Sequence, residues 1–310
     1  MPATPKSLLP LLLLVGCTPQ LDGAAPTWVD PFAPVFEEPV GAAYFAVLGP
    51  SNSGSSTNVI ILDSQGNEVR RLAVGNQQDP FEESFTLSWH HAGFFLVSTA
   101  GADFLTAVDP VTRDIWEFGA DAWASSMRNG VSSDGGVVAA AWSELFALAA
   151  DGDVVEQWEM PEGGPAWTDA IETEDGMLVA DYNGLVTRLS DGAVVHDSDG
   201  AWTDFVGVDG SGAMWMGHIS QTDLTWVEPE AEAVHLGAPG DLGLHPFLLS
   251  LEGAGPESVW ALNIESGGAS SRVSQVDRRG VVRHHFEVSA FWTDLIVLDE
   301  TYPQAAQDAD

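Results

Sequence analysis

Short apolar segments recur along the chain, and each is followed by a tight turn and a second apolar segment. The segments that begin at Val59, Leu145 and Leu185 share an alternating apolar stretch, a turn such as Asp151-Gly152, and a second stretch of the same kind. This pattern is typical of a β-hairpin. Looser copies start at Leu105, Leu224 and Arg272.

The starts of these hairpins are separated by 46, 40, 40, 39 and 48 residues. Between them lie two more apolar segments per unit, such as Trp167–Ile171 and Met177–Ala180. No segment shows a long helical pattern. A sheet-only chain with a period near 40 residues predicts an all-β fold, a β-propeller with one four-stranded blade per repeat.

The two ends of the repeat region complement each other. The last apolar segment, Phe291–Leu298, opens a blade that does not continue, and the first, Ala43–Leu48, lacks a strand before it. Joining them in one composite blade would protect the sheet edges that an open ring exposes. We therefore predict six blades, with five or seven as alternatives if the weak unit at residues 238–270 is misread.

The N-terminus has the order of a secretory signal. One positive side chain, Lys6, precedes the apolar run Leu8–Val15, and Gly16 and Cys17 follow it. The run is much shorter than the roughly 20 residues that a membrane-spanning helix needs. It is therefore predicted to be a cleaved signal peptide.

Leu14-Val15-Gly16-Cys17 resembles the lipobox of bacterial lipoproteins. The resemblance implies that the Cys17 thiol carries a diacylglycerol, that cleavage occurs before it, and that the mature protein is anchored in a membrane by acyl chains. The alternative is an ordinary signal peptide with an incidental cysteine. Cys17 is the only cysteine, so an intramolecular disulfide is excluded. Thr18, in place of the aspartate that retains enterobacterial lipoproteins at the inner membrane, favours the outer membrane of the cell envelope, facing the periplasm or the cell surface.

These features divide the chain into four parts. Residues 1–16 are the predicted signal peptide, and residues 17–40 are a lipidated tether punctuated by five prolines. Residues 41–300 are the predicted propeller, and residues 301–310 a polar tail.

The net charge is −36, from 10 lysines and arginines against 46 aspartates and glutamates. Lys6 is the only lysine and belongs to the signal peptide. Such a surface repels nucleic acid, which needs a basic footprint, and nucleic-acid binding is excluded as a function. A strongly charged surface also favours a soluble monomer.

Two segments resemble known propeller repeats. Val208–Gly217 is similar to the two-component-regulator propeller repeat, in which an Asp-Gly turn leads into a strand with tryptophan and glycine. Val108–Thr112 is similar to the turn of YncE-like and NHL-type propellers. Each resemblance covers part of one blade and implies the fold, because such repeats serve many functions.

An aromatic-Thr-Asp triplet recurs at Trp167, Trp202 and Trp292. In one interpretation, Asp169, Asp204 and Asp294 gather at a mouth of the central channel and could hold Ca²⁺, as in six-bladed metal-dependent lactonases and esterases. In the other, the tryptophans pack between blades and the aspartates bond to backbone. Repetition at equivalent positions favours the structural interpretation.

The histidines are the remaining candidates for chemistry. The pairs His90-His91 and His284-His285 lie in apparent strands, where neighbouring side chains point to opposite faces. Each pair can therefore supply one ligand to a given site, and no third ligand follows by spacing. His218, at the end of a strand, is the histidine that we single out as a binding residue.

The sequence favours a non-enzymatic function, in which a lipid-anchored propeller presents one face to a protein, peptide or glycan of the cell envelope. No cofactor is expected, and Ca²⁺ is the one candidate ion. The alternative is a metal-dependent hydrolase with its site at the channel mouth. An enzyme would need a dense, asymmetric group of polar residues there.

Overall fold

The computed structural model describes the propeller and most of its turns. The described residues are 44–50, 56–76, 84–99, 104–119, 126–141, 144–159, 166–198, 203, 205–218, 223–228, 231–265, 270–289, 292–298 and 302. The predicted signal peptide, the tether and Cys17 lie outside them. Among the described residues, no helix is long and apolar enough to cross a membrane.

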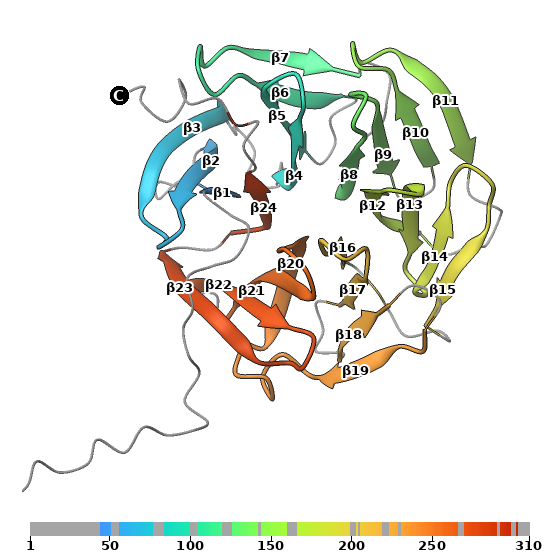
Figure 1. Ribbon diagram of the computed structural model, residues 1–310. Coiled ribbons are helices and arrows are strands. Elements are labelled where there is room, and N and C mark those ends of the chain that lie inside the picture. Colours follow the sequence, from blue (N-terminus) through green and yellow to red (C-terminus); the bar gives the residue numbers. More distant parts are fainter. Residues whose placement is uncertain are drawn as a thin grey trace, which may run out of the picture. The chain divides into compact units, whose positions relative to one another are not determined.

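The described chain forms six four-stranded antiparallel sheets arranged as the blades of a β-propeller (Figure 1). Each blade contributes its first strand to the centre of the ring and its fourth to the rim. The predicted six-bladed fold is confirmed, and the five- and seven-bladed alternatives are wrong. The weak unit near residues 238–270 supplies the first two strands of blade 6.

The strand bounds follow the predicted repeat. Blade 1 contains β24 (Asp294–Leu298), β1 (Tyr44–Pro50), β2 (Ser56–Asp63) and β3 (Glu68–Asn76). Blade 2 contains β4 (Ser84–His90), β5 (Phe94–Thr99), β6 (Leu105–Val108) and β7 (Ile115–Phe118), and blade 3 contains β8 (Ser126–Val131), β9 (Val137–Ala141), β10 (Glu144–Leu148) and β11 (Val154–Glu159). Blade 4 contains β12 (Trp167–Thr173), β13 (Gly176–Asp181), β14 (Leu185–Arg188) and β15 (Val194–Asp197). Blade 5 contains β16 (Phe205–Val208), β17 (Met214–Gly217), β18 (Leu224–Val227) and β19 (Val234–Gly237), and blade 6 contains β20 (Phe247–Gly253), β21 (Ser258–Ile264), β22 (Ser270–Asp277) and β23 (Val282–Ser289).

Blade 1 is the composite blade that the sequence predicts. The C-terminal strand β24 pairs antiparallel with the N-terminal strand β1, with Tyr44 opposite Leu298 and Leu48 opposite Asp294. The Thr293 N–H extends the ladder with a hydrogen bond of 2.8 Å to the Leu48 carbonyl. The two ends of the repeat region are therefore fastened to each other, and the ring is closed.

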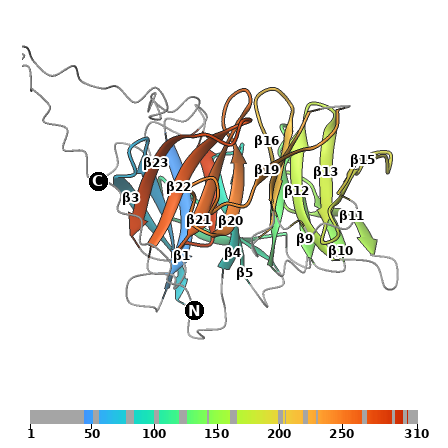
Figure 2. The ribbon, with the colours of Figure 1, turned by 90° about the horizontal axis from the view of Figure 1, so that it is seen from below.

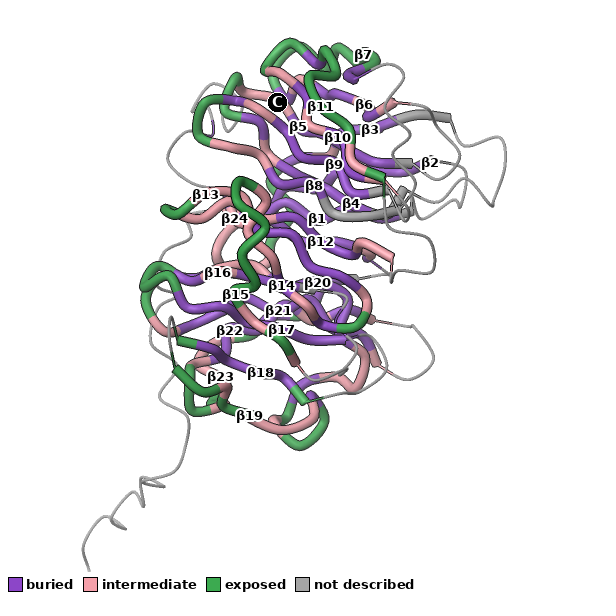
Figure 3. The backbone as a smooth tube through the Cα atoms, turned by 90° about the vertical axis from the view of Figure 1, so that its right-hand side faces the viewer, coloured by how far each residue is buried: buried purple, intermediate pink, exposed green. Residues whose placement is uncertain are grey.

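The hydrophobic core is divided into six clusters, one at each seam between neighbouring blades. Alternate residues of a middle strand face opposite seams. In β1, for example, Phe45 and Val47 face blade 6, whereas Ala46 and Leu48 face blade 2. This explains why the middle strands are continuous apolar runs. Burial accordingly follows the inner and middle strands, while outer strands such as β11 and β15 are largely exposed (Figure 3).

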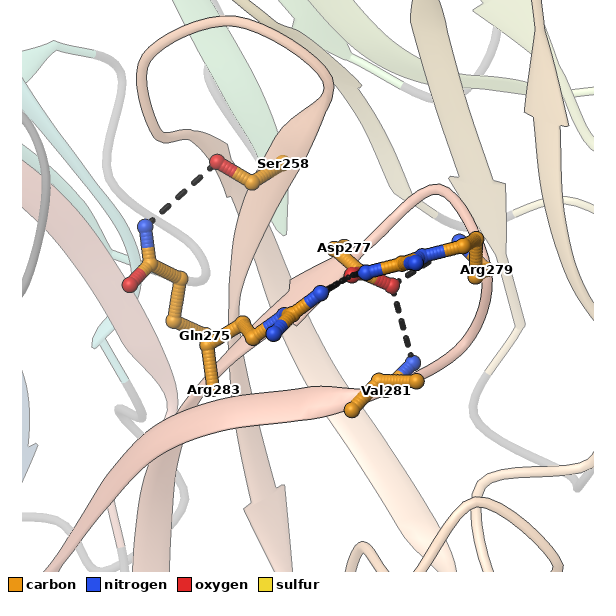
Figure 4. Close-up of polar contacts among 6 residues, drawn as sticks. All are labelled: Ser258, Gln275, Asp277, Arg279, Val281 and Arg283. Carbon is orange, nitrogen blue, oxygen red and sulfur yellow. Dashed lines mark hydrogen bonds and ion pairs between the residues drawn. The ribbon is translucent and has the colours of Figure 1, made fainter. Parts of the chain in front are cut away.

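In blades 2 to 6, the turn between the first and second strands and the turn between the third and fourth strands lie on one face of the ring, which we call the turn face (Figure 2). Blade 1 contributes its β2–β3 turn, because its first two strands come from opposite ends of the repeat region. In blade 6, Asp277 organises such a turn. Its Oδ1 accepts the N–H groups of Arg279 and Val281 at 2.9 and 3.0 Å, and Gly280 takes the left-handed conformation with φ of 75° (Figure 4). Asp63 and Gly66 build the same turn in blade 1.

The chain differs from the expected polar tail at Tyr302. This side chain is 3% exposed and packs against Tyr44, Trp89 and Phe95 at the seam between blades 1 and 2. Burial raises the pKa of Tyr302 to about 12. An aromatic ring can bury large apolar area after the last strand has ended, which the polar composition of the segment conceals.

Candidate functional site

Asp169 and Asp294 lie on the innermost strands β12 and β24 and are 1% and 2% exposed. In each, Oδ1 accepts the N–H of the next residue, at 2.9 Å for Asp169 and 2.8 Å for Asp294. Oδ2 accepts an N–H of the following blade at 2.7 Å, from Val206 for Asp169 and from Leu87 for Asp294. Each carboxylate thus joins two blades, and both of its oxygens accept backbone N–H groups.

Neutral side chains make similar bonds at other inner strands. Ser88 Oγ donates to the Asn129 carbonyl at 2.7 Å and links blades 2 and 3. Ser250 Oγ donates to the Leu295 carbonyl at 3.3 Å and links blades 6 and 1. The geometry of Asp169 and Asp294 therefore supports the structural interpretation of the triplet, in which the carboxylates are interblade links.

The tryptophans of the triplet occupy seams. Trp292 is 2% exposed in the cluster between blades 6 and 1, and the half-buried Trp167 packs against the cluster between blades 3 and 4. Trp202 and Asp204 lie outside the described residues. Their assignment as binding residues stays a prediction.

The candidate histidines also have structural partners. His218 is 3% exposed, and its ring meets Tyr182 edge-on with centroids 5.8 Å apart. His90 Nδ1 accepts the Ala92 N–H at 3.1 Å, so Nε2 carries the proton that it shares with the Gly135 carbonyl at 2.8 Å. Burial lowers the pKa of His90. Among the described residues, no group of three His, Cys, Asp or Glu side chains could hold a metal ion.

The asymmetry of the ring lies at the turn face, in the bonds between neighbouring blades. Five of the six seams are bridged there by a hydrogen bond that a turn residue makes. The bonds are, with their distances, Arg70 Nη2 to the Val111 carbonyl (3.5 Å), His90 Nε2 to the Gly135 carbonyl (2.8 Å), the Ser133 N–H to Glu172 Oε1 (2.8 Å), the Gly210 N–H to the Gly255 carbonyl (3.0 Å), and His284 Nε2 to the Ser64 carbonyl (3.2 Å). Within the described part of the chain, no such bond joins the turns of blades 4 and 5, and we call this place the open seam.

Some glycines of the turn face are packed against a neighbouring blade, and others are not. A Cβ atom added at Gly152 would come within 2.8 Å of the Gly119 nitrogen in blade 2, and one at Gly253 would overlap the Val208 carbonyl in blade 5. At the open seam, a Cβ at Gly212 would meet nothing within 4 Å, and one at Gly176 only Ser190 of its own blade at 4.0 Å. The turns beside Gly152 and Gly253 are therefore packed closely against a neighbouring blade, whereas those at Gly176 and Gly212 are not, as is also the case at Gly93 in blade 2.

A cavity of about 790 Å³ occupies the open seam. Its walls include the buried side chains of Leu178 from blade 4 and Met214 from blade 5, which both belong to the seam cluster. Its rim carries Glu174 and Asp175 from the β12–β13 turn and Ser211 from the β16–β17 turn. This size lies within the usual range of ligand pockets, about 300–1,000 Å³.

Arg188 lines the same cavity from β14, next to Leu178 in the sheet register. Its Nη1 pairs with Asp191 Oδ2 at 3.2 Å, but Nε is buried and has no hydrogen-bond partner. A buried donor without an acceptor is costly, at about 1–3 kcal/mol. The cavity therefore contains one unused polar donor beside an apolar wall.

The carboxylates at the rim differ from the aspartates that organise turns on the same face. In blade 6, Asp277 Oδ2 is shared by the guanidinium groups of Arg279 and Arg283 (Figure 4). Asp209, which also lines the cavity, accepts the Trp215 Nε1–H at 2.9 Å. By contrast, the exposed side chains of Glu174 and Asp175 have no hydrogen-bond or ion-pair partner in the described part of the chain. They leave a local excess of negative charge at the rim.

The sequence contains the two turns that form the open seam, but their role is visible only in three dimensions. Glu174-Asp175-Gly176 and Asp209-Gly210-Ser211-Gly212 resemble the other Asp/Gly turns of the repeat. The signal that could have drawn attention to them is the small size of Ser211 and Gly212, since a Cβ at Gly212 would meet nothing within 4 Å.

No protein-family model and no curated protein matches the chain. Among solved structures, TolB from Acinetobacter baumannii is 12% identical with a TM-score of 0.62, over 82% of this chain and 66% of TolB. A chain of the nidogen/laminin complex is 7% identical with a TM-score of 0.59, over 82% and 98%. Virginiamycin B lyase from Staphylococcus aureus is 15% identical with a TM-score of 0.52, over 69% and 72%. At these identities the likeness shows the propeller fold alone.

Proposed function

We propose that this protein is a lipid-anchored binding module of the bacterial cell envelope, whose propeller holds a protein, peptide or glycan partner at the open seam. The observation that carries the proposal is the asymmetry of the turn face, where one seam out of six has no bridging bond among the described residues and contains a cavity of about 790 Å³. Scaffold features recur from blade to blade, whereas binding sites break the repeat. The open seam is the feature that breaks it.

The lipobox supports the location. Lipid on Cys17 and a proline-punctuated tether over residues 17–40 would hold the propeller near a membrane while leaving its faces accessible. The engagement of Asp169 and Asp294 by backbone N–H groups supports binding over hydrolysis, because these carboxylates were the candidates for a catalytic ion. One similar structure belongs to a protein complex, that of nidogen with laminin.

Photocrosslinking in intact cells tests the proposal. A benzophenone amino acid, which reacts with C–H bonds of proteins and glycans alike, is placed at Ser211 on the rim of the cavity. The matched control carries it at Glu156, an exposed position of β11 in blade 3. We expect a discrete adduct in the membrane fraction from Ser211 alone. Equal adducts from both positions, or none from either, would contradict a binding site at the open seam.

A further inference from the structure

We propose that the open seam binds a polypeptide segment in which a lysine or arginine stands beside an apolar side chain. This proposal rests on the binding function proposed above and names the chemical class of the partner. Three properties of the cavity carry it: the charge of the rim, the apolar wall, and the unused donor of Arg188.

The rim attracts cations. Four carboxylates line the cavity, those of Glu172, Glu174, Asp175 and Asp209, against the single guanidinium of Arg188. Glu172 accepts the Ser133 N–H and Asp209 accepts the Trp215 indole N–H, so these two are held within the fold. The side-chain carboxylates of Glu174 and Asp175 are exposed and accept no hydrogen bond from any described residue. A cationic side chain of a partner supplies the charge that the chain itself does not place there.

The wall selects an apolar group next to that cation. Leu178 and Met214 are 4% and 5% exposed, and Val227 beside them is 4% exposed. An apolar side chain that enters the cavity extends the cluster between blades 4 and 5 and is stabilised by the burial of its apolar surface. A small hydrophilic cation would leave this wall without contact.

Arg188 selects a ligand with a hydrogen-bond acceptor. Its buried Nε has no partner, while its Nη1 remains paired with Asp191. Main-chain carbonyl groups accept hydrogen bonds from arginine, and a polypeptide segment brings them together with both kinds of side chain. A simple alkylamine has the cation and the apolar part but no carbonyl.

Binding of synthetic peptides to the full lipidated chain in detergent tests the proposal. Three fluorescent peptides of equal length alternate lysine with leucine, glutamate with leucine, and lysine with serine. Fluorescence anisotropy should show the tightest binding for the lysine–leucine peptide, and added salt should weaken it. Equal or tighter binding of the glutamate–leucine peptide would overturn the charge argument, and equal binding of the lysine–serine peptide would overturn the apolar one.

Two sets of variants locate the interaction. Glu174→Gln/Asp175→Asn should weaken binding of the lysine–leucine peptide roughly tenfold. Glu117→Gln/Glu156→Gln removes the same net charge from exposed positions of blades 2 and 3 and should leave binding unchanged. Equal losses in both would mean attraction to the whole acidic protein and would refute a site at the open seam.

Arg188→Gln gives an independent reading. It removes a positive charge from the cavity, so a cationic peptide would bind more tightly if Arg188 merely repelled it. If Arg188 donates a hydrogen bond to a peptide carbonyl, the variant should bind the peptide more weakly even though a repelling positive charge has been removed. This weaker binding is the result that we expect. Should no peptide bind while the benzophenone at Ser211 still gives its specific adduct, the proposed function stands and the cationic segment is wrong.

Discussion

Replacing Asp169 with alanine should destabilise the propeller strongly, although the side chain belongs to none of the six hydrophobic clusters. The change removes the acceptors of the Ala170 and Val206 N–H groups, both in buried surroundings. A buried N–H left without a partner costs about 1–3 kcal/mol, so the two together should lower the free energy of unfolding by roughly 2–6 kcal/mol. That is a large share of the 5–15 kcal/mol that typically stabilises a protein.

Denaturant titration, followed by tryptophan fluorescence, measures the change. Asp294→Ala breaks the corresponding link between blades 1 and 2 and should cost a similar amount. Asp153→Ala, at an exposed turn position of blade 3, is the control and should stay within about 0.5 kcal/mol of the parent. A change below that limit for Asp169→Ala would refute the assignment of these carboxylates as interblade links.

Adding calcium to the same proteins distinguishes interblade links from an ion-binding site at Asp169 and Asp294. An ion that binds only the folded chain stabilises it by mass action. If Asp169 and Asp294 are links, millimolar calcium should not raise the melting temperature of the parent relative to chelator. Stabilisation by calcium that disappears in Asp169→Ala would instead indicate a channel-mouth cation site and favour a hydrolase.

Four further changes test the anchor, the closure, the seams and a buried histidine. Cys17→Ser should abolish lipid labelling and move the protein out of the membrane fraction; unchanged partition would show that the lipobox assignment is wrong. Deleting residues 291–310 removes β24 and exposes the edge of β1, so the cooperative melting transition should be lost. Gly253→Ala places a Cβ that would overlap the neighbouring blade and should lower the free energy of unfolding by more than about 3 kcal/mol. Gly212→Ala should lower it by about 1 kcal/mol, because its only cost is the left-handed φ of 82°. Equal losses of stability would contradict the open seam. Burial lowers the pKa of His90 below its ordinary 6.5, so the unfolded chain takes up a proton at this histidine first as the pH falls. The stability of the folded protein should therefore drop below about pH 6.5. His90→Gln should make that drop smaller in thermal melts recorded over a range of pH.

The fold could be predicted from the sequence because its information is local and periodic. The hairpin at Val59–Val69 and its copies carry turn chemistry and strand alternation within about a dozen residues. Closure through Phe291–Leu298 and Ala43–Leu48 followed from two incomplete blades. The local sequence pattern did not indicate the burial of Tyr302, an aromatic side chain in a polar segment that packs on blades 1 and 2.

The site could not be predicted in the same way, because it depends on distant backbone groups. The repeated Asp in the triplet was visible, but the N–H groups that it binds lie 37 residues away for Asp169 and 207 residues away for Asp294. The open seam is a difference between similar turns, and its size depends on how closely blades 4 and 5 approach. Local propensity describes each turn and does not report that distance.

A ring can tolerate one open seam because its blades are fastened at more than one level. Blades 4 and 5 are joined at the centre by the bond from the Val206 N–H to Asp169 and along their length by the cluster that contains Val186 and Met216. At the turn face, the described residues of blades 4 and 5 make no bridging bond, whereas the other five seams are joined there. Opening there exposes turns and side chains but no unpaired strand edge, since every strand keeps its neighbours within its own blade. The cavity can therefore vary in shape and charge without weakening the sheets, which is the condition for a binding site to diverge on a repeated scaffold.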